Sequence, residues 1–263
     1  MVLLPWTPPY DWAWMVGFLQ ARAVAGVERF HDGGYSRSFG VEGHRGLIHL
    51  TPDEEAQGLR VSLSPGLQPV AEICYARIGQ LFDLACDPRQ VARTLGDLAQ
   101  ARPGLRLPGA MAARLTAKVA AGWGEPLAEA PGYVLFPTPE ALSRADPQAL
   151  KALGMPLRRA EALIHLARAA LSGELPLTAP ADIDAGLRQL QTLPGIGRWT
   201  ANYFALRGWQ AKDIFLPDDY LIKQRFPGMT PAAIARYARR WQPMRSYALL
   251  HIWYTDDWAP AAE

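Results

Sequence analysis

The chain has 263 residues, enough for one large domain or for two to three smaller ones with a buried core. It carries 27 basic and 25 acidic residues, a net charge of +2, so any nucleic-acid contact depends on local charge placement rather than on a broadly basic surface. Two cysteines, Cys74 and Cys86, are too few for an iron–sulfur cluster or a zinc site. The chain shows no signal-peptide pattern and no apolar window long enough to span a membrane. We therefore expect a soluble, cytoplasmic protein.

Residues 1–88 have the pattern of a separate α/β unit. Apolar spacing predicts a helix over Asp11–Arg22, with Asp11 as its N-cap, and a second helix over Gln68–Phe82. Four alternating runs separated by turn-forming residues predict strands at Gly26–Phe30, Tyr35–Val41, Leu47–Thr51 and Leu59–Leu63. Strands framed by two helices favour an antiparallel sheet that is covered on one face.

After residue 88 the composition becomes alanine-rich and helical. Helical spacing, interrupted by proline and glycine, predicts helices at Arg89–Arg102, Ala110–Gly122, Thr138–Ala145, Asp146–Leu153, Leu157–Ser172, Ala181–Leu190, Pro231–Trp241 and Pro243–Tyr254. The predicted fold class is therefore α+β, with an N-terminal antiparallel sheet and its helices followed by a multi-helix body.

A glycine turn lies within this body. In Leu193-Pro-Gly-Ile-Gly197, Pro194 fixes its own φ, while Gly195 and Gly197 permit positive φ. A helix precedes this turn, and another is predicted over Arg198–Gly208. Such a hairpin directs unpaired backbone N–H groups toward an anion, and a DNA phosphate is the natural occupant. An ordinary turn between two helices gives the same local pattern, because a lone G-x-G is weak evidence.

The run L-P-G-I-G-R-W-T-A, followed by Asp219 at 22 residues after Gly197, resembles the helix-hairpin-helix DNA glycosylase superfamily. From Trp6 to Thr255 the chain is similar to the family of bacterial inducible 3-methyladenine DNA glycosylases II. The resemblance implies one lobe of residues 89–109 and 212–263, which carries the catalytic aspartate. It implies another lobe of residues 110–211, with the hairpin at about 184–208. The DNA-binding residues that it implies are Pro194, Gly195, Ile196, Gly197 and Thr200.

Two adjacent carboxylates, Asp218 and Asp219, precede a helix expected from Tyr220. The resemblance makes Asp219 the catalytic residue. A carboxylate near C1′ stabilises the positive charge that develops as the glycosidic bond breaks, and it helps to position or deprotonate water. Aspartate before a helix is also a favoured N-cap, and the two roles are compatible. We expect Asp218 to lie beside the substrate as a cap or a structural acceptor.

Aromatic residues form the expected substrate pocket. In superfamily members that also cleave the DNA strand, a lysine nucleophile occupies the place that holds Trp199 here. The resemblance therefore implies displacement by water and an intact abasic site. It also implies that Trp199, Tyr203 and Trp253 line the pocket, where electron-rich rings attract a cationic alkylated purine. Tyr203 follows Trp199 by one helical turn, so the two share a face. For Trp253, packing in the core is the alternative.

The resemblance predicts a monofunctional DNA N-glycosylase of base excision repair that flips alkylated bases out of double-stranded DNA. The expected substrates are 3-methyladenine, other N-alkylpurines and, as further candidates, O2-alkylpyrimidines. No cofactor is required. Backbone carbonyls of Gln191, Leu193 and Ile196 are a candidate site for Na⁺ or K⁺, by resemblance alone. We expect a monomer.

The chain departs from the family between Gly109 and Ala110. There the family carries a helix and a turn, on the order of 20 residues or about 30 Å of helix. That turn is of the Leu-Gly-Gln type, and its apolar side chain wedges into the duplex. Without this segment, two functions stay open: an active glycosylase or a catalytically impaired DNA-binding relative. Retention of the other motifs favours the enzyme. We expect a destabilised helical body, in which Ala110–Ala121 would have to repack against Arg89–Arg102 and the hairpin.

Overall fold

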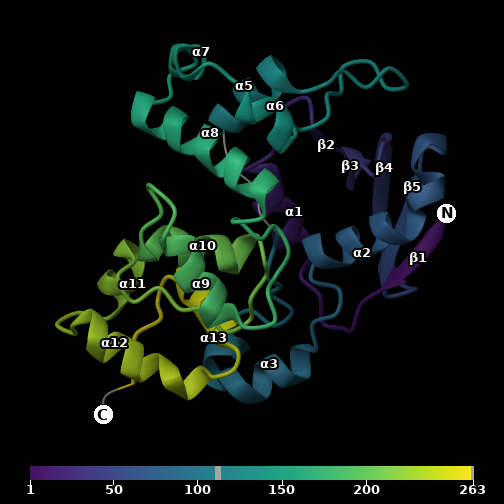
Figure 1. Cartoon of the computed structure of the whole chain (residues 1–263). Helices are drawn as coiled ribbons and strands as arrows, with labels where there is room; N and C mark the ends of the chain where they lie inside the picture. Colours follow the sequence, from purple (N-terminus) through teal and green to yellow (C-terminus); the bar gives the residue numbers. More distant parts are fainter. Residues whose placement is uncertain (110–113, 262–263) are drawn as a thin grey trace.

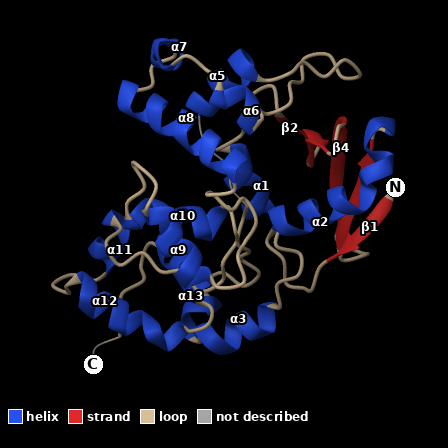
Figure 2. Ribbon diagram, viewed as in Figure 1, coloured by secondary structure: helices blue, strands red, loops and turns tan. Residues whose placement is uncertain are grey.

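The computed structural model describes residues 1–109 and 114–261. Its N-terminal unit is built on a five-stranded antiparallel sheet with the strand order β1-β5-β4-β3-β2 (Figure 2). The strands are β1 Val2–Pro5, β2 Glu28–His31, β3 Gly34–Val41, β4 His44–Asp53 and β5 Gly58–Leu63. The predicted antiparallel sheet is confirmed. Strand β1 was not predicted, because four residues are too short for an alternating pattern and the strand exists through its pairing with β5.

Helices cover one face of this sheet. They are α1 Trp12–Gln20, the 3₁₀ helix η1 Pro65–Val70 and α2 Ala71–Leu81. The backbone N–H of Trp14 donates to Asp11 at 2.9 Å, so Asp11 caps α1 as predicted. Alternate strand residues point to the helices, and Tyr35, Leu50 and Ile78 are fully enclosed in the resulting core.

The helical body consists of α3 Pro88–Leu95, α4 Asp97–Gln100, α5 Arg114–Trp123, α6 Pro139–Ser143, α7 Pro147–Ala152, α8 Leu157–Ser172, α9 Ile183–Gln191, α10 Arg198–Arg207, α11 Tyr220–Arg225, α12 Pro231–Tyr237, the 3₁₀ helix η2 Ala238–Trp241 and α13 Arg245–Trp253. A single helix over Arg89–Arg102 is wrong, because Gly96 at φ +57° ends α3 and starts α4 in a new direction. The start of the helix predicted from Ala110 lies outside the described residues. Within the described residues, no helix has both the length and the apolar character needed to cross a membrane.

Two hydrophobic clusters organise this body. Helices α5–α8 share one, which includes Val119, Leu150 and Ile164. Helices α3, α4 and α9–α13 share the other, so the hairpin packs with the C-terminal helices (Figure 1). Helix α5 places Ala120 against Val24 and Val27 of the N-terminal unit. The described part of this segment, α5, therefore packs on the N-terminal unit and on α6–α8, and not in the expected place against α3 and the hairpin. The lobe boundaries at 109/110 and 211/212 stay a prediction.

Candidate active site

The hairpin joins α9 to α10 through residues 192–197. Gly195 has φ +82°, which only glycine adopts at low cost, whereas Gly197 is extended at φ −83° and ψ 175°. Of the two glycines that permit positive φ, Gly195 adopts it and Gly197 does not. Leu193 is buried and Ile196 packs against the same core, which anchors the turn from below.

The outer side of the hairpin is open. Pro194, Gly195, Gly197 and Thr200 are exposed. Gly197 caps α10 without a side-chain hydrogen bond, so the N–H groups of the first turn of α10 point outward without an intrahelical partner. This arrangement presents donors and the positive end of the helix dipole to an anion.

Asp219 is the N-cap of α11, and four N–H groups converge on its carboxylate. Its Oδ1 accepts from the backbone N–H groups of Leu221 and Ile222 at 3.1 and 3.2 Å. The same oxygen accepts from Nε1 of Trp253 at 3.1 Å, while Oδ2 accepts from Nε1 of Trp199 at 3.4 Å. Trp199 and Trp253, which are far apart in the sequence, therefore meet at one carboxylate. This carboxylate is both the N-cap of α11 and the candidate catalytic group.

The aromatic residues of the candidate site divide between the surface and the core. Trp199 and Tyr203 share a helix face, as their spacing predicted, and their rings are stacked with centroids 4.9 Å apart and an interplanar angle of 8°. Trp199 is 45% exposed, so one face of its ring is open to a ligand. Trp253 is half-buried and packs against the core while its indole N–H reaches Asp219. Core packing of Trp253 is thus confirmed, and its place in the substrate pocket stays a prediction.

Asp218 has a different role from its neighbour. It is exposed and forms an ion pair with Arg198 at the start of α10. This pair links the loop before α11 to the hairpin across the surface. Of the two expected roles, Asp218 is thus a structural acceptor, and the cap is Asp219.

One buried cation behind the pocket had no signal in the sequence. Arg207, at the end of α10, is 6% exposed, and its guanidinium carbon lies 4.8 Å from the ring centroid of Phe18 in α1. The same carbon is 5.6 Å from the ring of Tyr203 and 5.8 Å from that of Trp253. Burial lowers the pKa of Arg207, and the nearby Tyr203 hydroxyl opposes this shift. The N-terminal unit therefore reaches the back of the site through Phe18, although nothing in its sequence indicated a part in the chemistry.

The stretch that leads to the departure point at Gly109 is held by the N-terminal unit. Leu107 N–H donates to Oδ2 of Asp83 at 3.0 Å, and Gly109 N–H donates to the carbonyl of Leu81 at 3.0 Å. Tyr247 of α13 donates to the same Asp83 oxygen at 2.7 Å. Burial raises the pKa of Asp83, and the bonds from Tyr247 and Leu107 oppose this shift. These hydrogen bonds therefore hold the chain in place as far as Gly109.

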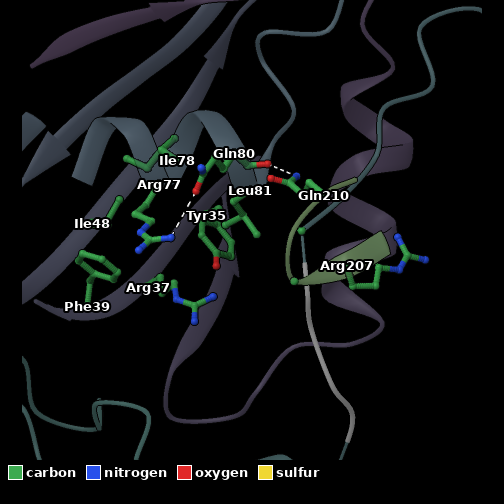
Figure 3. A pocket seen from close by; sticks show the side chains of 12 residues that line it. Tyr35, Arg37, Phe39, Ile48, Arg77, Ile78, Gln80, Leu81, Arg207 and Gln210 are labelled. Atoms are coloured by element: carbon green, nitrogen blue, oxygen red, sulfur yellow. Dashed lines mark hydrogen bonds between the residues drawn. The ribbon is translucent and has the colours of Figure 1, made fainter. Parts of the chain in front are cut away.

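A cavity of about 250 Å³ opens beside Gly109, between the sheet, α2 and the end of α10 (Figure 3). Its lining includes Tyr35, Phe39 and Leu81, and none of the predicted site residues. Asp219 is therefore not part of its lining, whereas Gly109, where we expect the chain to depart from the family, is. The described residues leave this space open.

The fold and the site together define a class of protein. A family model described as "HhH-GPD superfamily base excision DNA repair protein" matches residues 106–246, and one described as "AlkA N-terminal domain" matches residues 1–112. The chain belongs to the HhH-GPD superfamily of base excision DNA repair proteins.

Within that class, the chain is 60% identical to "DNA-3-methyladenine glycosylase 2" of Escherichia coli, over 99% of each chain. Their alignment covers 279 positions, 16 more than this chain has residues, so at least that many residues of the relative have no counterpart here. This agrees with a missing segment of about the expected size.

Solved structures show the same fold. "3-methyladenine dna-glycosylase from Archaeoglobus fulgidus" matches with a TM-score of 0.79 at 19% identity, covering 96% of this chain and 97% of that one. The 8-oxoguanine glycosylase/lyase of Clostridium acetobutylicum, in complex with double-stranded DNA, matches with a TM-score of 0.65 at 16% identity, over 88% of each.

Proposed function

We propose that the chain is a monofunctional DNA N-glycosylase that excises alkylated bases from double-stranded DNA in base excision repair. The observation that carries the proposal is the carboxylate of Asp219, which is held next to the open face of Trp199 in a site without a lysine nucleophile. The 60% identity to a 3-methyladenine glycosylase supports the substrate class, which comprises 3-methyladenine, other N-alkylpurines and O2-alkylpyrimidines.

The two oxygens of Asp219 are suited to different tasks. Oδ1 accepts three hydrogen bonds, which fix the carboxylate in place. Among the described residues, Oδ2 accepts only the long bond from Trp199, so it remains available to face C1′ of the flipped nucleotide. A negative charge held there stabilises the sugar cation as the base departs, and it orients the water that completes the displacement. The product is an abasic site with an intact strand.

The base itself needs an aromatic surface. Because Trp199 and Tyr203 are in stacking contact, no base fits between them. The alkylated base therefore stacks on the open face of Trp199. A purine alkylated at a ring nitrogen is cationic, so the electron-rich ring attracts it and the base is already a good leaving group. Recognition by stacking suits a range of alkylated bases.

DNA is the expected partner of the hairpin. Exposed N–H groups at the start of α10, with Thr200 beside them, are suited to a phosphate and carry no sequence information. Carbonyls of Gln191, Leu193 and Ile196 would hold a Na⁺ or K⁺ ion close to that phosphate. The fit is acceptable: the Leu193 carbonyl accepts from the N–H of Ile196 at 3.1 Å, which leaves its second lone pair available. We propose that the protein acts as a monomer and without another cofactor.

The alternative, a DNA-binding relative that no longer turns over, is not favoured. A chain released from selection for catalysis has no reason to keep Asp219, its cap, both indole donors and the stacked pair in mutual contact.

A single-turnover assay tests the proposal. Duplex DNA with one methylated purine is incubated with excess protein, and released base and strand breaks are measured separately. We expect released base, unbroken strands until alkali is added, and no covalent complex after borohydride treatment. A trapped complex would contradict the displacement by water, and the absence of base release would contradict the glycosylase activity.

A further inference from the structure

The buried cation at the end of α10 is not used by the mechanism above. Within the described residues, Arg207 forms no ion pair with a carboxylate. Its Nη1 donates to the carbonyl of Pro108 at 3.3 Å, and its Nε has no partner. Its guanidinium instead contacts the rings of Phe18, Tyr203 and Trp253.

The side chain of Arg207 points away from the cavity beside Gly109. Figure 3 shows Arg207 pointing away from the other labelled lining residues, so the guanidinium does not serve that space. It lies behind the base pocket, with two of its three rings belonging to the predicted substrate-binding residues. A guanidinium is planar and weakly hydrated, which allows it to be buried against aromatic faces where an ammonium group would be less stable.

We propose that Arg207 is a positioning residue for base excision. Its guanidinium fixes the ring of Tyr203, which supports Trp199 by stacking, and the ring of Trp253, which donates to Asp219. One buried group thereby sets the distance between the stacking surface and the catalytic carboxylate. The contacts to Phe18 and Pro108 hold the guanidinium itself, so the N-terminal unit and the stretch before Gly109 determine the shape of the pocket.

The inference rests on the proposed glycosylase activity, and its test is a comparison of variants. Arg207→Met keeps the length and the apolar contact but removes the charge and the donors. We expect single-turnover base release to fall about 10- to 100-fold, as is usual when a catalytic group is misplaced by a fraction of an ångström. DNA affinity should stay within about twofold, because the hairpin and its exposed donors are unchanged. Arg207→Lys should recover part of the rate.

The matched control is Arg240→Met. Arg240 also covers an aromatic ring, with its guanidinium carbon 3.4 Å from the ring of Tyr237, but it is exposed and its contacts in the described structure are with Tyr237. Base release by this variant should match that of the parent. Loss of rate in both variants would show a general effect on folding and overturn the positioning role.

A double-mutant cycle separates a positioning role from a purely structural one, because only a positioning role couples the rate losses of the two variants. Trp253→Phe keeps the ring and removes the N–H that reaches Asp219. If Arg207 acts through Trp253, the losses from Arg207→Met and Trp253→Phe should combine to clearly less than their product. Multiplicative losses, or an unchanged rate in Arg207→Met, would overturn the proposal. Should Arg207→Met not fold, the same cycle with Arg207→Lys decides the matter. Inactivity of the parent itself would count against the proposed function instead.

Discussion

The surroundings of the Asp219 carboxylate and of the junction at Gly109 differ in how completely the neighbouring residues fill and bond them. At Asp219, N–H groups from α10, α11 and α13 meet within 3.4 Å of one side chain. At Gly109 the preceding residues are firmly hydrogen-bonded, yet a cavity opens beside them. Under the proposed function, breaking the glycosidic bond depends on the site at Asp219 and opening the duplex on the junction at Gly109. The contacts of the first are in place, whereas at the second we expect a helix of the family to be missing.

The largest effect on base release is expected from removing the negative charge of Asp219. Asp219→Asn should lower base release at least about 1000-fold, within the range for loss of a charged stabilising group in an active site. Binding to DNA should hardly change, since the hairpin supplies the phosphate contacts. The control is Asp218→Asn, which breaks only an exposed ion pair and should stay within about threefold of the parent. Base release by Asp219→Asn at the parent rate would refute the assignment.

The next effect concerns the junction. Inserting the helix of the E. coli relative between Gly109 and Ala110 should raise the rate on intact duplex about 10- to 100-fold, because flipping costs a few kcal/mol that a wedge offsets. The rate on a base that is already unpaired should change little. The inserted helix should also cover Phe39 and Leu81, which are half-buried at the cavity. Full burial of each such side chain stabilises the fold by about 1.5–3 kcal/mol, so Tm should rise by about 5–10 °C.

A Gly-Ser insertion of the same length is the control for the restored helix. It lengthens the connection without supplying an apolar face, so it should change neither Tm nor the duplex rate. If the family's helix also changed neither, the cavity and the missing wedge would have no energetic consequence.

A smaller effect sharpens the description of the catalytic side. Trp253→Phe keeps an aromatic ring in the core but removes one of the three donors to Oδ1 of Asp219. A hydrogen bond to a charged group is worth about 1.5–3 kcal/mol, so base release should fall about tenfold or more. Trp258→Phe is the matched control, because Trp258 packs against the same core and makes no bond to Asp219. Equal rates in the two variants would show that the Trp253 N–H is dispensable.

Replacing His251 should have the smallest effect on activity at neutral pH, and its main consequence should be for stability at acidic pH. His251 is buried in α13, two residues before Trp253. Burial, together with the charge of Arg102, lowers the pKa of His251 to about 4. Unfolded histidine titrates near pH 6.5, so the unfolded state binds a proton first as the pH falls. Stability is therefore fully present above pH 6.5 and is lost toward pH 4.

Urea unfolding at pH 7 and pH 5 measures this loss. The contribution of His251 should amount to about 2 kcal/mol between these two pH values. The variant His251→Gln should lack that part of the pH dependence. An identical pH dependence in both proteins would mean that His251 is protonated in the folded state or accessible to solvent.

Local sequence patterns determined most of the fold and the order of the site residues along the chain. Period-2 and period-3.6 patterns are set by residues within a few positions of one another, so the sheet and nearly every helix were predictable. Proline and glycine predicted the hairpin, and the spacing of Trp199 and Tyr203 placed both rings on one helix face. Asp219 was identified by its distance from Gly197 together with a family resemblance.

Tertiary structure decided what these residues touch. The two indole N–H groups reach Asp219 from positions 20 residues before it and 34 residues after it, a contact that no local pattern encodes. The break at Gly96, strand β1 and the packing of α5 on Val24 and Val27 each depend on partners far along the chain. Burial of Arg207 behind the pocket is the clearest case, since an arginine next to a glycine reads as an exposed helix end. Only the approach of Phe18, Pro108 and Trp253 encloses it, because burial is a property of the assembled core and not of the neighbouring sequence.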